Sequence, residues 1–138
     1  MLKNKYAVET LPISDAFLRE KRLIQSRGEL VLLSDGEEIR HITFFTLNPG
    51  HGYFRGGHFH KKKSEKFYIV SGKARLSLAD VEDGENSTIE LIPGQRVTIY
   101  PMCAHKFKAI TVTQVIEYYS KPFDLSDDNR FEGFEGEI

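Results

Sequence analysis

Short apolar runs separated by turn residues recur about every ten residues along the chain, a rhythm typical of an all-β domain. Segments that alternate polar and apolar residues bury one face of a strand, whereas continuous apolar runs are buried on both faces. We expect strands at residues 30–33, 42–47, 67–70, 73–79, 88–91, 96–99 and 112–119. The runs at 67–70 and 112–119 fit central strands. The pattern predicts a β-sandwich or a β-barrel.

The two ends of the chain differ from this pattern. Only Ser14 to Lys21 has helical character, and it is short for a stable helix. The acidic tail, residues 126–138, is expected to pack loosely or to fray. A chain of 138 residues with 40% hydrophobic content supplies one core and too little for two ordinary domains. We expect a single domain over 1–138, with its core at residues 28–120 between flanking segments.

Composition and charge exclude several classes of protein. Lys and Arg total 19 against 20 Asp and Glu, so no basic field favours nucleic acid. Cys103 is the single cysteine, which excludes an intrachain disulfide and a multi-cysteine zinc site. No activating base is evident beside it, so we expect a buried structural thiol. No stretch approaches the ~20 apolar residues of a membrane span, and no signal peptide is recognisable. We expect a cytoplasmic protein without nucleic-acid or membrane partners.

Three histidines and a glutamate have the spacing of a metal site. Residues two apart on a strand point to the same side, so His58 and His60 present two imidazoles together. Glu65 enters the neighbouring strand after a bend, and His105 begins a later strand. This donor set suits a divalent metal, with Zn favoured and Fe, Mn, Ni or Co as alternatives. The competing interpretation is that these side chains only hydrogen-bond inside a barrel.

Other polar residues beside this cluster are candidates for substrate contacts. Arg55 precedes His58, and its guanidinium could bind a phosphate or pyrophosphate through two parallel hydrogen bonds. Lys61 and the two lysines after it form either a solvated bend or a cationic patch that attracts a phosphorylated substrate. Tyr100 is the candidate general acid among the tyrosines. His41 and His51 have no partner and are expected to lie outside the site.

The stretch from Gly52 to Gly72 resembles the first cupin motif at every defined position, and residues 94–105 are similar to the second. Tyr100, Met102 and Ala109 stand where cupins commonly have Pro, Gly and Asn, but the ligand histidine of that motif is present. The resemblance implies a double-stranded β-helix, or jelly roll, as the fold.

A narrower resemblance is to small sugar-modifying cupins: dTDP-4-keto-6-deoxyhexose 3,5-epimerases, 3,4-ketoisomerases and the cupin domain of capsular-polysaccharide enzymes that act on UDP-sugars. The segments that carry it are 26–30, 55–62, 101–105 and 118–131. It implies a homodimeric epimerase or isomerase of a nucleotide-linked 4-keto sugar in polysaccharide biosynthesis. The catalytic base of these families maps onto His58, the second histidine of the ketoisomerases onto His60, and the arginine near the nucleotide diphosphate onto Arg55.

The metal leaves a choice open. The ketoisomerases generally lack one, whereas the capsular cupin domain resembles this chain in having the full set of ligands. His58 cannot be a metal ligand and a free base at once, so a bound metal would act either as a Lewis acid or structurally. A metal-dependent oxygenase and a non-catalytic sugar-binding protein remain alternatives, because a fold does not fix an activity.

Overall fold

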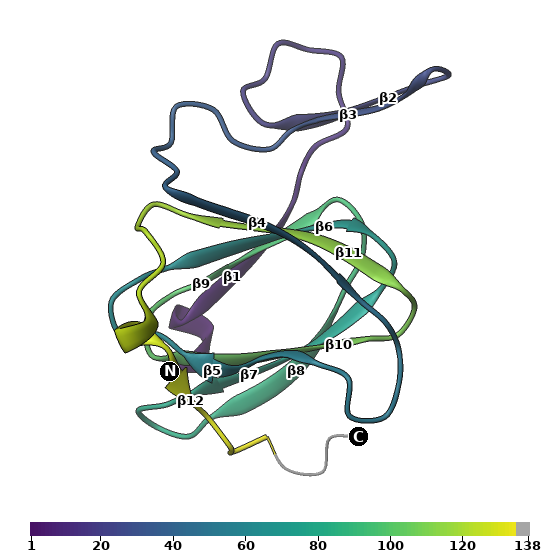
Figure 1. The fold of residues 1–138 in the computed structure, drawn as a ribbon. Coiled ribbons are helices and arrows are strands. Elements are labelled where there is room, and N and C mark those ends of the chain that lie inside the picture. The colour runs from purple at the N-terminus through teal and green to yellow at the C-terminus, as the bar shows by residue number, and fades with distance from the viewer. Residues whose placement is uncertain (135–138) are drawn as a thin grey trace.

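Two five-stranded antiparallel sheets face each other in the computed structural model, which describes residues 1–134 (Figure 1). The first sheet has the order β1 (Tyr6–Thr10), β9 (Gln95–Ile99), β6 (Glu65–Ser71), β11 (Thr113–Tyr119), β4 (His41–Leu47). The second has the order β12 (Asn129–Arg130), β5 (Arg55–Phe59), β10 (Cys103–Ala109), β7 (Ala74–Asp80), β8 (Asn86–Leu91). The predicted all-β jelly roll is confirmed.

Three smaller elements complete the fold: a hairpin of β2 (Lys21–Gln25) and β3 (Gly28–Leu32), and the 3-10 turns η1 (Leu2–Asn4) and η2 (Leu125–Asp127). In the part of the chain that the structure describes, no helix is long and apolar enough to cross a membrane.

The predicted strands correspond to β3, β4, β6, β7, β8, β9 and β11, with ends shifted by a few residues. The two predicted central strands, β6 and β11, each have a neighbour on both sides. The segment from Ser14 to Lys21, whose sequence has helical character, forms no helix. This segment bends instead, because the Ser14 hydroxyl accepts the Ala16 N–H at 3.0 Å and the Lys21 ammonium donates to the Ala16 carbonyl. Such local side-chain bonds compete with a short helix.

The core lies between the sheets and consists of apolar side chains from both. Its fully buried members include Ile69, Leu76, Leu78, Leu91, Val97, Phe107 and Val115. Cys103 is also fully buried, and burial raises the pKa of its thiol to about 12. This thiol is structural, as predicted, because a thiol that stays protonated is a poor nucleophile.

The β2–β3 hairpin, which we call the arm (residues 21–32), stands clear of the barrel (Figure 1). Its root is held by Arg96, whose guanidinium donates to Glu9 at 2.8 Å, Glu20 at 2.6 Å and the Leu33 carbonyl at 2.7 Å. Burial disfavours the charged guanidinium, but the two carboxylates outweigh burial and raise its pKa. The ion-pair network therefore fixes where the arm leaves the barrel.

The C-terminal segment does not fray where the structure describes it. Strand β12 pairs with β5, and Phe131 donates its N–H to the Gly57 carbonyl at 2.9 Å. The buried Asp127 carboxylate accepts the N–H groups of Lys61 at 2.7 Å and Lys62 at 3.2 Å. The last part of the predicted tail, 135–138, lies outside the described residues.

Candidate functional site

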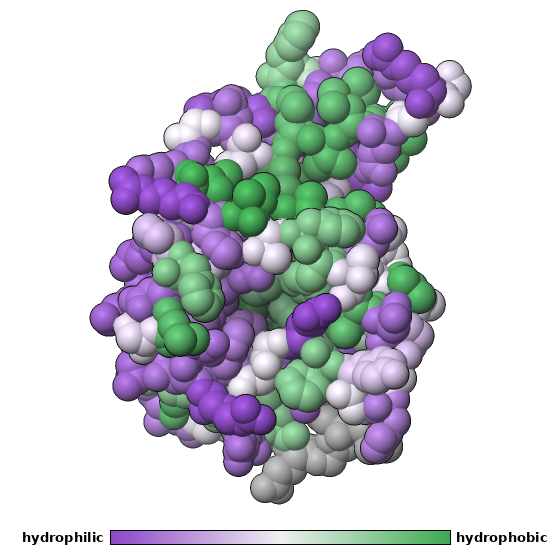
Figure 2. Space-filling view, viewed as in Figure 1, coloured by the Kyte–Doolittle hydropathy of each residue, from purple (hydrophilic) through white to green (hydrophobic). Residues whose placement is uncertain are grey.

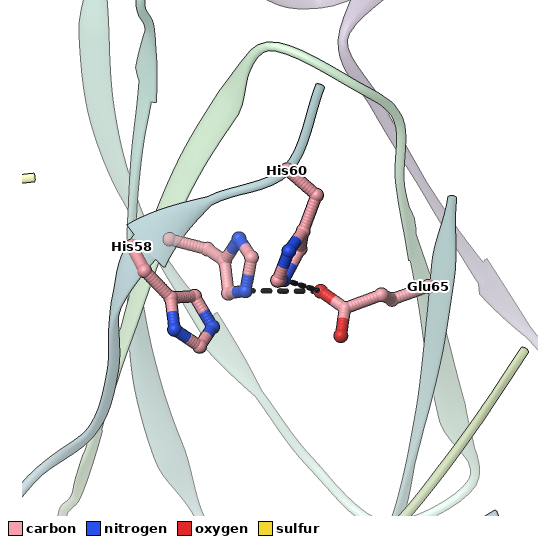
Figure 3. A group of neighbouring side chains, drawn as sticks. His58, His60 and Glu65 are labelled. Atoms are coloured by element: carbon pink, nitrogen blue, oxygen red, sulfur yellow. Dashed lines mark ion pairs between the residues drawn. The ribbon is translucent and has the colours of Figure 1, made fainter. Parts of the chain in front are cut away.

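Three imidazoles and one carboxylate meet in the space between the two sheets (Figure 3). His58 lies on β5 and His60 directly after it, His105 on β10 and Glu65 at the start of β6. Each residue offers one donor atom, and these atoms all lie within 4.8 Å of one another. The structure therefore brings together the four residues whose spacing suggested a metal site, and the cluster could hold a metal ion.

A glycine on β5 allows this convergence. The pairing of β5 with β10 shifts register next to His105, and Gly56 lies at the shift with φ +90°. A Cβ at Gly56 would come within 2.7 Å of the His105 carbonyl oxygen. A side chain would push the strands apart, so glycine is required for the close approach that places His58 beside His105.

Each of the three imidazoles is oriented from behind through its Nδ1 atom. The partners are the Asp128 carboxylate for His58 (2.9 Å), the Asp127 carbonyl for His60 (2.5 Å) and the Cys103 carbonyl for His105 (3.1 Å). An acceptor at Nδ1 favours the tautomer that carries its proton there, which leaves the lone pair on Nε2. The three Nε2 atoms are thus prepared to bind a cation or to accept a proton.

Two imidazoles aim their Nε2 atoms at one carboxylate oxygen. Glu65 Oε1 lies 3.0 Å from His60 Nε2 and 3.2 Å from His105 Nε2, the two ion pairs dashed in Figure 3. The angles do not make hydrogen bonds, so all three buried atoms lack a hydrogen-bond partner. Buried polar atoms without partners are costly. Two nitrogens and one carboxylate oxygen are ordinary ligands of a divalent metal, so these residues fit one.

His58 differs from the other two imidazoles. Its side chain is 27% exposed, against 6% for His60 and 1% for His105. Burial and the neighbouring His105 lower the pKa of His58 to about 4, although Asp128 opposes the shift. At neutral pH the imidazole of His58 is therefore uncharged and able to take a proton.

The Glu65 carboxylate is charged despite its burial. Burial raises its pKa, but the imidazoles of His105 and His60, when they carry a proton on the Nε2 atoms that face Oε1, outweigh burial and hold the pKa well below its usual range. For His60, burial lowers the pKa, and Glu65 together with the Asp127 carbonyl reverses this and raises it. The centre of the cluster is thus a negative site that attracts a cation.

Several ionisable residues of the site were not predicted, among them Lys63 and Glu117. Lys63 is 5% exposed, so the predicted solvated bend is wrong for this lysine, which lies 3.9 Å from Glu65 and 3.8 Å from the centre of the Tyr119 ring. Nothing in its sequence context distinguishes it from its neighbours.

Glu117 lies on the inner face of β11, where burial and Glu65 raise its pKa to about 9. A charged residue at an inward position of a central strand was the available signal.

The raised pKa of Glu117 predicts that Glu117→Gln stabilises the protein in a pH-dependent way. Since the carboxyl is protonated in the folded protein up to about pH 9 but only to about pH 4.5 when unfolded, the wild type loses stability as pH rises between these values. Glutamine stays neutral. With EDTA present, denaturant melts should show a gain that is about 4 kcal/mol larger at pH 8 than at pH 5. Equal changes at both pH values would contradict it.

Two cavities adjoin the cluster, and His58 and Gly56 line both. The inner cavity, of about 180 Å³, lies between the sheets and is lined largely by aromatic rings with Arg55 and Glu117. The outer groove, of about 550 Å³, is lined by Phe54, Lys106, Asp128, Arg130, Phe131 and Phe134. Arg55 is therefore at the site.

Two predicted site residues are not brought into these cavities. Lys61 is exposed, and its N–H rather than its ammonium is bound, by Asp127. Tyr100 is 40% exposed and binds the Lys5 carbonyl through its backbone N–H. Neither residue lines the inner cavity or the outer groove, so neither has a role in the proposed reaction.

Comparisons with known proteins agree with this architecture. Residues 24–130 match the model of the polysaccharide biosynthesis C-terminal domain. Over 78 residues the chain is 33% identical to a UDP-2-acetamido-2,6-beta-L-arabino-hexul-4-ose reductase of Pseudomonas aeruginosa, a match that covers 49% of this chain and 20% of that protein. The chain thus matches about a fifth of the length of that relative.

Two solved structures illustrate the fold. QdtA, a sugar 3,4-ketoisomerase from Thermoanaerobacterium thermosaccharolyticum in complex with TDP, is 20% identical, with a TM-score of 0.74 over 94% of this chain and 90% of QdtA. CapF, a capsular polysaccharide assembling protein from Staphylococcus aureus, is 22% identical, with a TM-score of 0.62 over 82% of this chain and 34% of CapF. The resemblance to sugar-modifying cupins is confirmed at the level of the fold.

Proposed function

Because the chain belongs to the polysaccharide biosynthesis C-terminal domain family, we propose that it is an isomerase or epimerase of a nucleotide-linked 4-keto sugar. One observation carries the proposal: His58 is uncharged, is backed by Asp128 and opens onto both the inner cavity and the outer groove. An uncharged imidazole with a fixed tautomer is suited to remove a proton from a carbon beside a ketone.

The two cavities divide the substrate between them. The inner cavity, whose walls include the rings of Phe67 and Phe107, holds the keto sugar away from water. The outer groove is the place for the nucleotide. Lys106 and Arg130 supply cationic groups there beside the carboxylates of Asp128 and Glu132, of which Glu132 pairs with Arg130 at 3.2 Å. Phe131 and other rings offer surfaces for a base. The complex of QdtA with TDP supports a nucleotide substrate. Arg55 lines the inner cavity beside Gly56 and His58, which line both cavities, and would bind the diphosphate from there.

The reaction begins at His58 Nε2. This atom takes the proton from the carbon beside the ketone. The Nδ1–H of His58 remains hydrogen-bonded to the Asp128 carboxylate, which stabilises the imidazolium that forms. The electron pair of the broken C–H bond moves into an enediolate. Reprotonation of the neighbouring carbon, with transfer of the hydroxyl proton of the first carbon to the former ketone oxygen, gives the isomeric ketone. Reprotonation of the same carbon from its other face gives the epimer. Neither outcome needs an oxidant.

We assign a divalent metal, with zinc favoured, to His60, Glu65 and His105. Each of these three side chains has a buried polar atom without a hydrogen-bond partner, whereas His58 is more exposed and remains a base. In this assignment His58 is the base and not a ligand. When bound, the metal would stabilise the developing charge on the enediolate oxygen.

The experiment that tests the function uses a panel of TDP- and UDP-linked 4-keto sugars in D₂O, followed by NMR. We expect deuterium at the carbon beside the ketone of at least one substrate, together with an isomeric product. Ligand binding without exchange or turnover across the panel would instead identify a non-catalytic sugar-binding protein.

A second candidate function is a metal-dependent oxygenase. Two histidines and one carboxylate around open positions are also the ligand set of non-haem iron oxygenases, and this chain has that set in His60, His105 and Glu65. Iron in the purified protein with oxygen uptake would favour this candidate, and zinc alone would exclude it.

We also propose that the protein is a homodimer formed through the arm. The side chains of Ile24 and Leu30 on the arm are 52% and 54% exposed, and those of Ile42 and Phe44 on the edge strand β4 are 68% and 54% exposed. Figure 2 shows hydrophobic side chains gathered along the arm and its junction with the barrel. A free two-stranded hairpin is marginally stable in water, and an open edge strand invites pairing.

Light scattering should therefore give twice the mass of one chain for the wild type. Replacing both arm residues, Ile24→Ser with Leu30→Ser, should shift the protein to monomer at micromolar concentration, because the variant loses the apolar contacts of the interface. Ile92→Ser, at a residue 48% exposed outside the arm and β4, serves as the control and should stay dimeric. A monomeric wild type would overturn the proposal.

A further inference from the structure

The wall of the inner cavity that faces His58 carries a hydroxyl connected to a second imidazole. Thr43 on β4 lines the cavity, and its Oγ1 lies 2.6 Å from His41 Nε2. Figure 1 shows that β4 and β5 belong to opposite sheets, so Thr43 and His58 approach the cavity from opposite sides. Because residues two apart share a face of a strand, His41 and Thr43 lie in one row along β4.

His41 is held in place by stacking. Its ring lies parallel to that of Tyr119, with 4.3 Å between centroids and 8° between planes, and Phe123 packs at 6.3 Å. His41 is half-buried, so it contacts Thr43 on one side and solvent on the other. Burial and the charge of Lys63 lower its pKa. The imidazole is therefore uncharged at neutral pH and can exchange protons quickly.

The chemistry of the proposed reaction needs such a group. Once His58 has removed a proton, the enediolate must be reprotonated, and delivery to its other face requires a donor on the facing wall. The Thr43 hydroxyl is too weak an acid to remain deprotonated, but it can pass a proton on if a neighbour replaces it at once. His41, at hydrogen-bond distance, can replace it and recover a proton from solvent.

We propose that Thr43 and His41 form a second proton-transfer path, which delivers a solvent proton to the face of the sugar opposite His58. This inference rests on the proposed function. Thr43 is the catalytic residue, because it lines the cavity proposed for the sugar, and His41 is a positioning residue that acts through it. The step balances: the carbon gains the Thr43 proton, Thr43 takes one from His41, His41 takes one from water, and His58 releases the abstracted proton to water.

The test separates the two halves of the reaction in D₂O. The variants Thr43→Val and His41→Phe keep the side-chain volume and the ring, respectively, but remove the path. Exchange of the substrate's own proton, which needs only His58, should persist within about threefold of wild type. Product formation should fall about 10²-fold. A merely structural role for the two residues would lower exchange and product formation together.

Matched controls are Thr46→Val, at an exposed threonine of the same strand, and His51→Phe, at an exposed histidine. Both should form product at the wild-type rate. If the wild type turns over and the path variants match it, or lose exchange and product equally, this inference is overturned while the proposed function stands. If the wild type neither exchanges nor converts any keto sugar of the panel, the proposed function fails and this inference fails with it.

Discussion

Replacing His58 by asparagine is expected to lower kcat for the keto-sugar reaction about 10³-fold, the largest effect of any single substitution in this account. Asparagine keeps a polar group that can still donate to Asp128, but it has no basic nitrogen for the proton of the substrate. KM should change little, because the other residues that line the groove proposed for the nucleotide are unchanged. Steady-state kinetics on the most active substrate of the panel would measure both constants.

Asp128→Asn provides the graded comparison for this prediction. It leaves the base in place and weakens only its orientation, so kcat should fall about 10- to 100-fold. The thermal melting temperature of His58→Asn should stay within a few degrees of wild type, since the side chain is partly exposed. A variant without His58 that kept a tenth or more of the wild-type kcat would show that another group takes the proton.

Glu65→Gln is expected to cost about 3 kcal/mol of folding stability and to abolish metal binding. The carboxylate is 2% exposed and is the shared partner of His60 and His105, so a neutral amide leaves two buried imidazoles without a charge to face. Lys63, 3.9 Å away and 4% exposed, loses its carboxylate as well. Denaturant unfolding gives the free energy, and elemental mass spectrometry gives the metal content.

The control for that substitution is Glu90→Gln, which breaks the ion pair of a half-exposed glutamate with Lys73. Such surface pairs contribute little, so the change should stay under about 0.5 kcal/mol with metal content unchanged. If Glu65→Gln retained metal at the wild-type level, the cluster would not be the metal site.

Strand positions and the imidazole cluster could be predicted because short-range rules govern them. Alternation located β7, β8 and β9, and the same period of two placed His58 and His60 on one side of β5. The helical character of Ser14 to Lys21 does not lead to a helix, because the bonds of Ser14 and Lys21 to Ala16 fold the segment into a bend. Helix propensity does not reveal such competing side-chain bonds.

Contacts between distant segments could not be predicted. Asp128 reaches His58, and Glu117 reaches Glu65, only because the sheets bring them together across many residues of sequence. Nor did a run of three lysines show that Lys63 alone turns inward over an aromatic ring. The sequence therefore located the histidines and the glutamate of the cluster, whereas the groups that set their protonation could be identified only from the fold.

The most direct test of the central claim, that His58 is a base beside a three-ligand metal site, is the metal content of His58→Asn. Wild type and variant would be purified without a polyhistidine tag and measured by elemental mass spectrometry. The account predicts that the variant retains the metal of the wild type, about one per chain, while product formation is lost. Loss of metal together with activity would make His58 a fourth ligand and contradict its assignment as the base.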